Sequence, residues 1–474
     1  MSGSGEIAVL DVGKTNVDLW VAGRDGPLIE NRSLENTVLE GPPWRHHDLN
    51  ALADWLGGTL ADLCKDHPIR TLVPVGHGSG GVLVGPDPTA ANLGAVLPMI
   101  DYEQPCPPEI NREYQTKAGL FEDRGSPILM ATTHAARQLL WMERAEPKAF
   151  EAAQHYLNIA QFWGWWLTGV AASEHSAMGA QSHLWNVPRR QWAPIVRSQG
   201  WQRLLPSFKP AWAPLGPIRG ELARRFTLPE DLTVLTGSHD STANFFRYVA
   251  AGVSEFTLVS TGTWVVALSQ GADPGRLDQK RGTTINADMD GAPVCGALTM
   301  GGREFSAIAG PGWSGQNAGL ETIERLVSRG TMALPSFGEN EGQFPGSARQ
   351  GRILGPQPDT QEERTALAVL HAALLTVACA DVLAGGDRLI LDGTFLKEPL
   401  FAPLVAALRK GKRTEASHET HGVVAGAVCL ARTHDSRAPT PLSLDAIEGI
   451  EIPGLLDYAK TWRFAAEQQG AIAT

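Results

Sequence analysis

The stretch "IAVLDVGKTNVDLWVAG", residues 7–23, decides how the N-terminal half of this chain folds. Two apolar runs rich in β-branched residues flank the polar segment "DVGKTN", and this pattern predicts two antiparallel strands joined by a tight turn. Asp11 ends the first run, and Gly13 permits the turn. Asp and Asn are ordinary turn formers, so this turn alone does not separate a structural role from a functional one.

Length, charge and cysteine content exclude several classes of protein. The 474 residues are enough for roughly two to four domains, and 43% hydrophobic residues can fill their cores. The net charge is −11 and no basic block occurs, so we expect no nucleic-acid partner. We expect a cytoplasmic protein with no membrane partner, because the chain shows neither a signal peptide nor about 18 consecutive apolar residues. The five scattered cysteines, without a CxxC pair, predict buried, reduced thiols.

A second hairpin pattern begins about half-way along the chain. Residues 256–271, "FTLVSTGTWVVALSQG", again place a small polar turn with Gly and Thr between two apolar strands. If each hairpin opens a large domain, two turns rich in backbone N–H groups face one another across a cleft, an arrangement that suits phosphates. Strand–turn–strand patterns are common, so the repetition by itself leaves coincidence open.

Helical patterns alternate with these strands. Apolar residues recur at three- and four-residue spacing over residues 128–169, where a cluster of tryptophans predicts a buried core. Residues 362–385 predict a long, largely buried helix, residues 388–393 a strand, and residues 421–433 a helix of small residues. Strands that alternate with long helices predict an α/β fold.

Four motifs in this order resemble the FGGY carbohydrate kinase family, most closely its branch of L-fuculose and L-rhamnulose kinases. They are the opening turn, "GSHDS" (237–241), "STGTW" (260–264) and the pair "LDGTF" (391–395) with "VAGAVCLA" (424–431). The resemblance implies two actin-like (ribonuclease-H-like) domains with a cleft between them, and the use of ATP and Mg²⁺. It also implies transfer of the γ-phosphoryl group to a sugar hydroxyl.

The same resemblance implies which domain binds the sugar and which binds the nucleotide. Residues 1–245 would form an N-terminal domain that binds sugar and phosphate, and residues 246–474 a C-terminal domain that binds the nucleotide. The partners would be ATP and a ketose, first a 6-deoxyhexulose such as L-fuculose or L-rhamnulose and second a pentulose. Met99 and Ile100 would supply an apolar wall for the methyl group of such a sugar. Whether the protein forms a homodimer is left open by the resemblance.

Carried over motif by motif, the resemblance assigns the site residues. Phosphoryl transfer needs a base that accepts the sugar proton, and Asp240 would be this catalytic base; the structural alternative is a helix N-cap. Asp11 would face Mg²⁺. The phosphates and nucleotide would contact Gly13, Lys14, Thr15, Asn16, Thr261, Gly262, Thr263 and Gly393, and the sugar would contact His77, Gly80, Gly81, Asp101 and His239. Lys14 as a solvated turn residue, and the histidines as structural residues, are the alternatives.

The chain also departs from the family pattern. The glycine triplet for adenine is reduced to Gly393, Thr394 and Phe395, and we expect Phe395 to pack in the core while Gly393 alone approaches the base. Gln138 stands where the family usually has lysine, and Ser173 and Glu174 replace a Thr-Asp pair. These departures motivate the alternative of a non-catalytic sugar- or nucleotide-binding regulator with the same fold.

Overall fold

The computed structural model describes residues 5–23, 26–433 and 442–471. The chain divides into two compact units. The first runs to Gly252 and also includes Ile285–Pro293 and the helix α15 (Gly422–Ala431). The second unit comprises Val253–Thr284, Val294–Thr420 and the segment from Ser443 onward. The continuous part of the first unit ends close to residue 246, but later segments of the chain return to this unit.

The first unit is built on one seven-stranded mixed sheet. Its strand order is β11-β12-β6-β1-β2-β3, and β13 also pairs with β6. The strands are β1 (Glu6–Val12), β2 (Asn16–Ala22), β3 (Leu28–Glu35), β6 (Ile69–Gly76), β11 (Pro214–Pro217), β12 (Thr233–Leu235) and β13 (Ser238–His239). β1 and β2 form the predicted antiparallel hairpin, whereas β1, β12 and β13 run parallel to β6.

Helices cover both faces of this sheet because the side chains of β1 alternate between two hydrophobic cores. Ile7 and Val9 pack in a core with α10 and α15, whereas Ala8 and Leu10 pack in a core with α1 and α6. The bounds of these helices are α1 (Leu49–Asp66), α6 (Ile159–Thr168) and α10 (Asp240–Ala250). Both faces of the central strand are therefore dry, as in other sheets of parallel strands.

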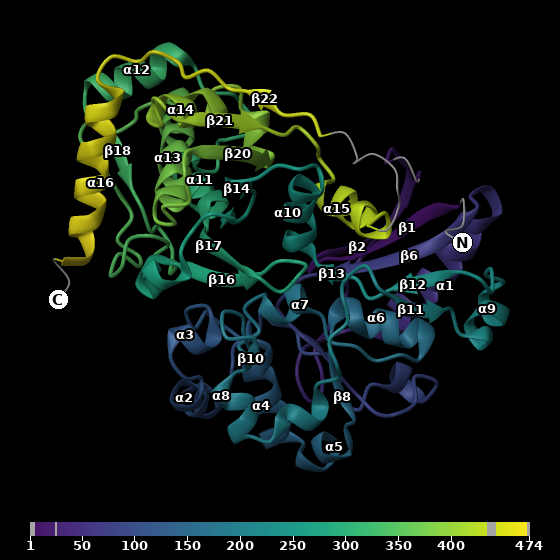
Figure 1. The fold of residues 1–474 in the computed structure, drawn as a ribbon. Coiled ribbons are helices and arrows are strands. Elements are labelled where there is room, and N and C mark those ends of the chain that lie inside the picture. The colour runs from purple at the N-terminus through teal and green to yellow at the C-terminus, as the bar shows by residue number, and fades with distance from the viewer. Residues whose placement is uncertain (1–4, 24–25, 434–441, 472–474) are drawn as a thin grey trace. The chain divides into compact units, whose positions relative to one another are not determined.

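The first unit has further strands and helices outside its seven-stranded sheet (Figure 1). They include β7 (Gly81–Val84), β8 (His155–Asn158), α2 (Pro108–Lys117), α4 (Ala135–Ala145), α5 (Pro147–Ala152), α7 (His175–Gly179) and α9 (Gly220–Phe226). Trp163, Trp165 and Trp166 on α6 are at most 2% exposed, which confirms that they belong to the core. All five cysteines are free; three are buried and two are half-buried.

The second unit has its own mixed sheet. Its central strands follow the order β17-β15-β14-β20-β21-β22. They are β14 (Phe256–Thr261), β15 (Val265–Ser269), β17 (Pro293–Thr299), β20 (Arg388–Gly393), β21 (Arg413–Ala416) and β22 (Asp445–Ala446). β14 and β15 form the predicted second hairpin, and β14, β20 and β21 are parallel.

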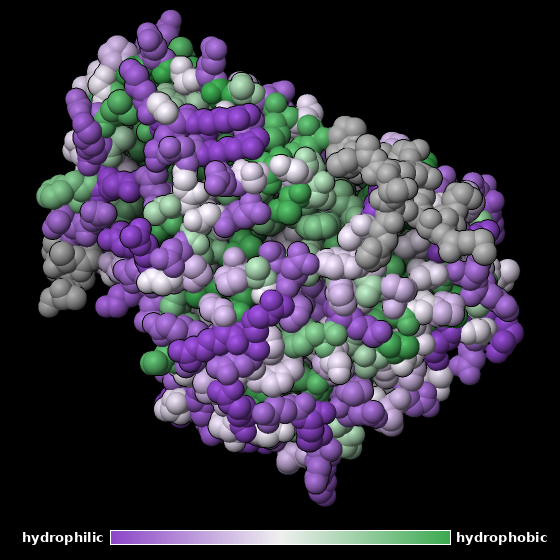
Figure 2. Space-filling view, in the orientation of Figure 1, coloured by the Kyte–Doolittle hydropathy of each residue, from purple (hydrophilic) through white to green (hydrophobic). Residues whose placement is uncertain are grey.

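A long helix, α13, forms the centre of the second core. The helices here are α11 (Gly301–Ala309), α12 (Leu320–Ser328), α13 (Gln361–Asp381), α14 (Phe401–Leu408) and α16 (Leu455–Ala471). α13 is long and apolar enough to cross a membrane by length and composition, but 89% of its apolar window is buried inside the protein. That burial is what the core helix of a globular unit requires. Hydrophilic side chains cover most of the molecular face drawn in Figure 2.

Candidate active site

Three parallel strands of the first unit end side by side. Val75 of β6 is paired with Asp11 on one side and with Ser238 on the other, and the next residue, Gly76, is flanked by Val12 and His239. The residues that follow these strands therefore emerge at one edge of the sheet. The carboxyl ends of parallel strands are the usual place for ligands in α/β folds. This register brings together Asp11, His77, His239 and Asp240.

Asp240 lies at the first residue of α10, directly after β13. Its Oδ1 accepts hydrogen bonds from the backbone N–H and the hydroxyl of Ser241, and it lies 3.1 Å from Nε2 of His239. The N-cap position belongs to His239, so Asp240 is not the N-cap that the structural alternative required. These contacts all engage Oδ1 of the carboxylate.

Asp11 is a carboxyl in an unfavourable environment for charge. Burial raises its pKa to about 8, and the nearby carboxylates of Asp240 and Asp18 add to the effect. A divalent cation would relieve this repulsion. Within the described ranges, no cluster of three or more His, Cys, Asp or Glu side chains could hold a metal ion. Asp11 thus fits a Mg²⁺ ion that takes few protein ligands and keeps its waters, as this cation does.

Burial disfavours the charged form of both His239 and His77. Burial lowers the pKa of His239, although the Asp240 carboxylate opposes this, and burial together with the neighbouring His47, His239 and Lys14 lowers the pKa of His77 to about 3. Nε2 of His239 lies 3.1 Å from Oδ1 of Asp240, and the hydroxyl of Thr242 lies 3.0 Å from its Nδ1. His239 therefore lies beside the proposed base, and its ring contacts Thr242.

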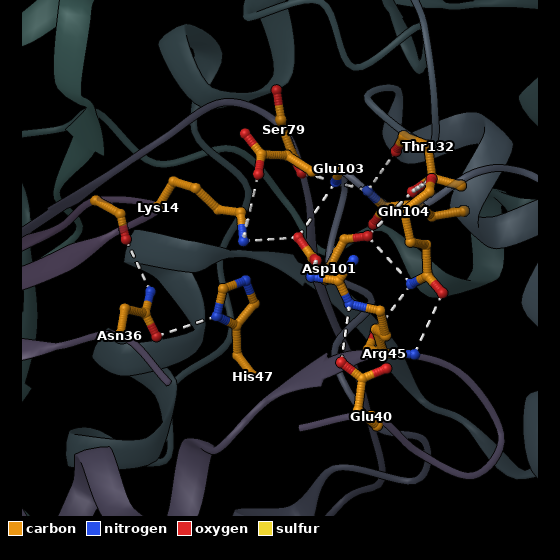
Figure 3. A network of polar contacts seen from close by, with 12 residues as sticks. Lys14, Asn36, Glu40, Arg45, His47, Ser79, Asp101, Glu103, Gln104 and Thr132 are labelled. Carbon is orange, nitrogen blue, oxygen red and sulfur yellow. Dashed lines mark hydrogen bonds and ion pairs between the residues drawn. The ribbon is translucent and has the colours of Figure 1, made fainter. Parts of the chain in front are cut away.

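The opening turn supports an ion-pair network. Lys14 Nζ lies 2.8 Å from Oδ1 of the fully buried Asp101, and Arg45 Nη2 lies 2.9 Å from its Oδ2 (Figure 3). Burial raises the pKa of Asp101, but the hydrogen bond from Lys14, that from the Glu103 backbone and the charges of both cations outweigh it, so the net pKa is lowered. Lys14 is only 17% exposed, so it is not a solvated turn residue.

We expect the network to hold the structure together as well as the site. Asp101→Asn leaves Lys14 and Arg45 without their shared counter-charge and should lower the free energy of unfolding by about 2 kcal/mol. Asp62→Asn is the matched control, because Asp62 also forms an ion pair, at 2.7 Å with Lys65, but is 76% exposed. The control should leave stability nearly unchanged. Urea unfolding of both variants checks this, and equal losses would contradict a structural role for Asp101.

The other predicted residues of the turn have backbone contacts. Gly13 N–H donates to Asn16 O at 3.0 Å, and a Cβ at Gly13 would meet that oxygen at 2.9 Å, so the turn closes tightly on a glycine. Thr15 and Asn16 are exposed. Thr15 O accepts from the backbone N–H of Asn36 at 2.8 Å. Their contact with phosphate stays a prediction.

The loop after β6 is shaped by two glycines and Gln138. Gly80 has a positive φ of +149°, and a Cβ there would lie 3.2 Å from Gln138 Oε1. Gly81 begins β7, where a Cβ would meet Leu157 O at 2.2 Å, so strand pairing with β8 demands a glycine. Gln138, at the position of the family's lysine, donates to Ser79 O at 3.2 Å and to Thr132 O at 2.7 Å. An uncharged amide here holds the loop through backbone carbonyls.

Sequence reasoning missed two residues that border this cluster. His47 hydrogen-bonds to Asn36 and its ring lies 6.5 Å from that of His77. Tyr102 packs against His77 at 5.1 Å and lies under Lys14, whose Nζ is 5.8 Å from the ring centroid. Adjacency to the predicted Asp101 was a signal for Tyr102. "RHHD" at residues 45–48 carries no spacing that singles out His47.

Glu174 links to His239 through Ser176. Glu174 is fully buried at the N-cap of α7 and accepts hydrogen bonds from Ser176 N at 2.9 Å and Ser176 Oγ at 2.6 Å. Ser176 Oγ in turn accepts from the backbone N–H of His239 at 3.0 Å. The acidic residue that departs from the family pattern thus helps to position the loop that bears Asp240.

Glu174 makes stability depend on pH. Burial raises its pKa from 4.5 to about 7 despite its hydrogen bonds, so between these values the folded protein keeps a proton that the unfolded chain has released. This contribution to stability is complete below pH 4.5 and is lost as pH rises to about 7. We expect Glu174→Gln to gain stability relative to the parent across that window. Urea unfolding over this range measures the difference, and a pH-independent difference would contradict it.

In the second unit, the predicted residues lie at one end of its parallel strands. Thr261 of β14 is paired with Gly393 of β20, and the turn Gly262–Thr263 follows directly. Thr261 Oγ1 donates to Asp392 O at 2.8 Å, and it accepts from the Phe395 N–H at 3.1 Å. The structure thus brings Thr261, Gly262, Thr263 and Gly393 together.

Sequence reasoning missed the glycine pair at the start of α11. The N–H of Gly302 donates to Thr263 O at 3.1 Å, and a Cβ at Gly302 would lie 2.5 Å from Gly262 O. The predicted turn and this helix therefore touch through their backbones. The "GG" at residues 301–302 was the available signal.

Phe395 packs against the second core, as predicted. It is half-buried, and its ring lies 5.3 Å from that of Phe401 and 5.9 Å from that of Phe305. Its side chain is therefore held in place by contacts with apolar neighbours.

Two family models match most of the sequence. Residues 7–246 match the N-terminal domain of the FGGY family of carbohydrate kinases, and residues 253–439 match the C-terminal domain of carbohydrate kinase FGGY. The chain belongs to the FGGY family of carbohydrate kinases. This confirms the predicted family and its two-domain, actin-like α/β fold.

Relatives and solved structures agree with this assignment. L-fuculokinase from Salmonella typhi is 25% identical over 305 residues, and the match spans 60% of this FGGY kinase and only 60% of that relative's length. A carbohydrate kinase from Novosphingobium aromaticivorans has a TM-score of 0.86 at 28% identity, over 97% of this chain and 100% of that one. Plasmodium falciparum glycerol kinase with ADP has a TM-score of 0.79 at 14% identity, over 98% of both chains, and shows the shared fold alone.

Proposed function

We propose that this FGGY kinase transfers the γ-phosphoryl group of ATP to a hydroxyl of a ketose. The observation that carries the proposal is the convergence of Asp11, His77, His239 and Asp240 at the carboxyl edge of β1, β6 and β13. A protein that only binds a sugar or a nucleotide needs no base beside an oriented imidazole. A kinase needs one, because the sugar hydroxyl must lose its proton as it attacks phosphorus.

The residues take these roles in the proposal. Asp240 accepts the proton of the sugar hydroxyl, and the N–H and hydroxyl of Ser241 hold the carboxylate in place beside His239. His77 and the backbone at Gly80 and Gly81 contact the sugar. The turn at Gly13–Asn16 and the turn at Thr261–Thr263 supply N–H groups for phosphates. Gly393 contacts the adenine of the nucleotide. Mg²⁺ at Asp11 would neutralise phosphate charge.

The substrate class rests on the fuculokinase relative and on one feature of this chain. Met99 and Ile100 are buried next to Asp101 and would form an apolar wall. A 6-deoxyhexulose such as L-fuculose or L-rhamnulose carries a methyl group that fits such a wall, and a pentulose is the second choice. An enzyme that draws on ATP and a soluble sugar would work in the cytoplasm.

An ADP-release assay against a panel of ketoses and polyols tests the function. L-Fuculose or L-rhamnulose should give the highest kcat/KM, D-xylulose and D-ribulose should follow, and glycerol should be poor because it leaves the pocket unfilled. Robust phosphorylation of glycerol with no ketose turnover would overturn the substrate class. Saturable sugar binding with no ADP release from any sugar would favour the non-catalytic regulator.

Asp11→Ala should weaken the dependence on Mg²⁺. Without the carboxylate, half-maximal turnover should need about tenfold more Mg²⁺ or more, since one charged ligand is lost. Titration of ADP release with Mg²⁺ at fixed ATP measures the shift. Asp62→Ala is the control, because it removes the same carboxylate from a side chain that is 76% exposed and pairs with Lys65. Superimposable Mg²⁺ titrations of parent and Asp11→Ala would contradict the metal role.

A further inference from the structure

A chain of hydrogen bonds leads from the opening turn to His47. Asn36, just after β3, donates from Nδ2 to Gly13 O at 2.7 Å, and its Oδ1 lies 3.0 Å from Nδ1 of His47 (Figure 3). A backbone carbonyl only accepts, so the amide nitrogen of Asn36 must face Gly13. Its amide oxygen then faces His47, and Nδ1 of His47 must carry the proton.

This assignment leaves the other nitrogen of His47 as a bare acceptor. His47 is 3% exposed, and burial together with the charge of Lys14 lowers its pKa to about 4, so the ring is neutral. Among the described residues its Nε2 is buried without a hydrogen-bond partner. In Figure 3 this nitrogen points away from Asn36, toward the side of Lys14 and Asp101. The Lys14 ammonium is already engaged by Asp101 and Glu103.

His77 has the opposite polarity. The backbone N–H of Ser79 donates to its Nδ1 at 3.3 Å, so in the neutral ring Nε2 carries the proton. That N–H is also buried and has no partner in the part of the chain that the structure describes. The two rings lie 6.5 Å apart. His47 therefore offers a hydrogen-bond acceptor, and His77 offers a donor.

We propose that His47 is a second substrate-binding histidine, whose Nε2 accepts a hydrogen bond from a sugar hydroxyl while Nε2–H of His77 donates one. This inference rests on the proposed function. A hydroxyl is complementary to such a pair because it donates and accepts, whereas a carboxylate would place lone pairs against His47. The site is therefore built for neutral polyhydroxy ketoses and against sugar acids. Asn36 is a positioning residue that sets the ring proton and ties this contact to the phosphate-binding turn.

The competing explanation is a buried water on His47. A void of about 10 Å³ borders the ring, and its other lining residues include Met99, Leu52 and Phe162. That volume is enough for one water, but apolar walls give it few further partners. A water held there would make Nε2 of His47 insensitive to sugar.

Long-range ¹H–¹⁵N spectra of the full-length protein with ¹⁵N-histidine separate the two. Without sugar, His47 should be protonated at Nδ1 and His77 at Nε2. Saturation with the best ketose of the panel should shift both Nε2 resonances, and gluconate should shift neither. A His47 protonated at Nε2, or an Nε2 that does not respond to a ketose the enzyme phosphorylates, would overturn the proposal.

Substitution supplies the kinetic test. His47→Leu should raise KM for that ketose about 10- to 100-fold while kcat changes little, because a hydrogen bond to a buried group is lost. His47→Gln, which restores an acceptor, should recover part of this loss. His46→Leu is the matched control: His46 hydrogen-bonds to Trp44 O at 2.9 Å and should leave KM unchanged. Asn36→Leu should raise KM and alter the protonation of His47 in the same spectra.

The outcomes separate this inference from the function on which it rests. Active parent protein with an unchanged KM in folded His47→Leu and His47→Gln would overturn the role of His47 alone. A parent protein inactive on every ketose would overturn the proposed function. If His47→Leu fails to fold, His47→Gln and the spectra of the parent protein decide.

Discussion

Asp240→Asn should lower turnover about 10²- to 10⁴-fold while sugar binding and the melting temperature stay close to those of the parent. The amide keeps the size of the side chain and can still accept from Ser241 through its oxygen, but it cannot take the proton of the sugar hydroxyl. The chemical step therefore loses its base while the ground-state contacts persist. Measurement of kcat and KM in the ADP-release assay, together with sugar binding by calorimetry, gives the result.

The control for this variant is another aspartate at a helix start in the same unit. Asp48 caps α1, where it accepts from Ala51 N–H at 3.0 Å, and it is not proposed to contact substrate or nucleotide. Asp48→Asn makes the same change of atoms and should leave turnover intact. Near-normal turnover in Asp240→Asn would remove this residue from the mechanism.

Gly393→Val should cause the largest loss of stability among these variants. Gly393 has a φ of +94°, and a Cβ there would lie 2.1 Å from Thr261 O and 2.7 Å from Thr261 N. Any side chain must push β20 away from β14 in addition to the backbone strain, so we expect a loss of at least about 3 kcal/mol. Urea unfolding and limited proteolysis measure it.

Gly386→Ala is the matched control for this strain. Gly386 has a similar φ of +101°, but a Cβ there meets nothing within 4 Å. Its substitution should cost about 1 kcal/mol, the strain of the left-handed backbone alone. Equal losses at both positions would show that the contact with Thr261 is relieved at no cost.

The expected loss of stability limits what Gly393→Val can show about nucleotide binding. The sequence predicts that valine here blocks the approach to adenine, whereas the close pairing with β14 adds a second reason for a glycine. Loss of ATP binding in Gly393→Val therefore counts only if the variant is folded. Phe395→Ala, in a half-buried side chain that packs on Phe305 and Phe401, should mainly lower stability.

The sequence by itself determined the features that depend on near neighbours. Both hairpins follow from alternating apolar residues on either side of a polar turn, since successive side chains of a strand point to opposite faces of the sheet. The buried tryptophans of α6 follow from helical spacing, and the order of four short motifs was enough for the family. Each of these signals lies within a few consecutive residues.

Only the tertiary structure decided which side chains meet. Lys14 finds its counter-charge on Asp101, and Asn36 joins Gly13 to His47, through contacts between segments that no local pattern connects. α15 packs in the first unit although most of the second unit precedes it in the chain. Local propensity fixes the period of an element but not its neighbour, and burial, charge pairing and hydrogen-bond satisfaction act only once the chain has folded.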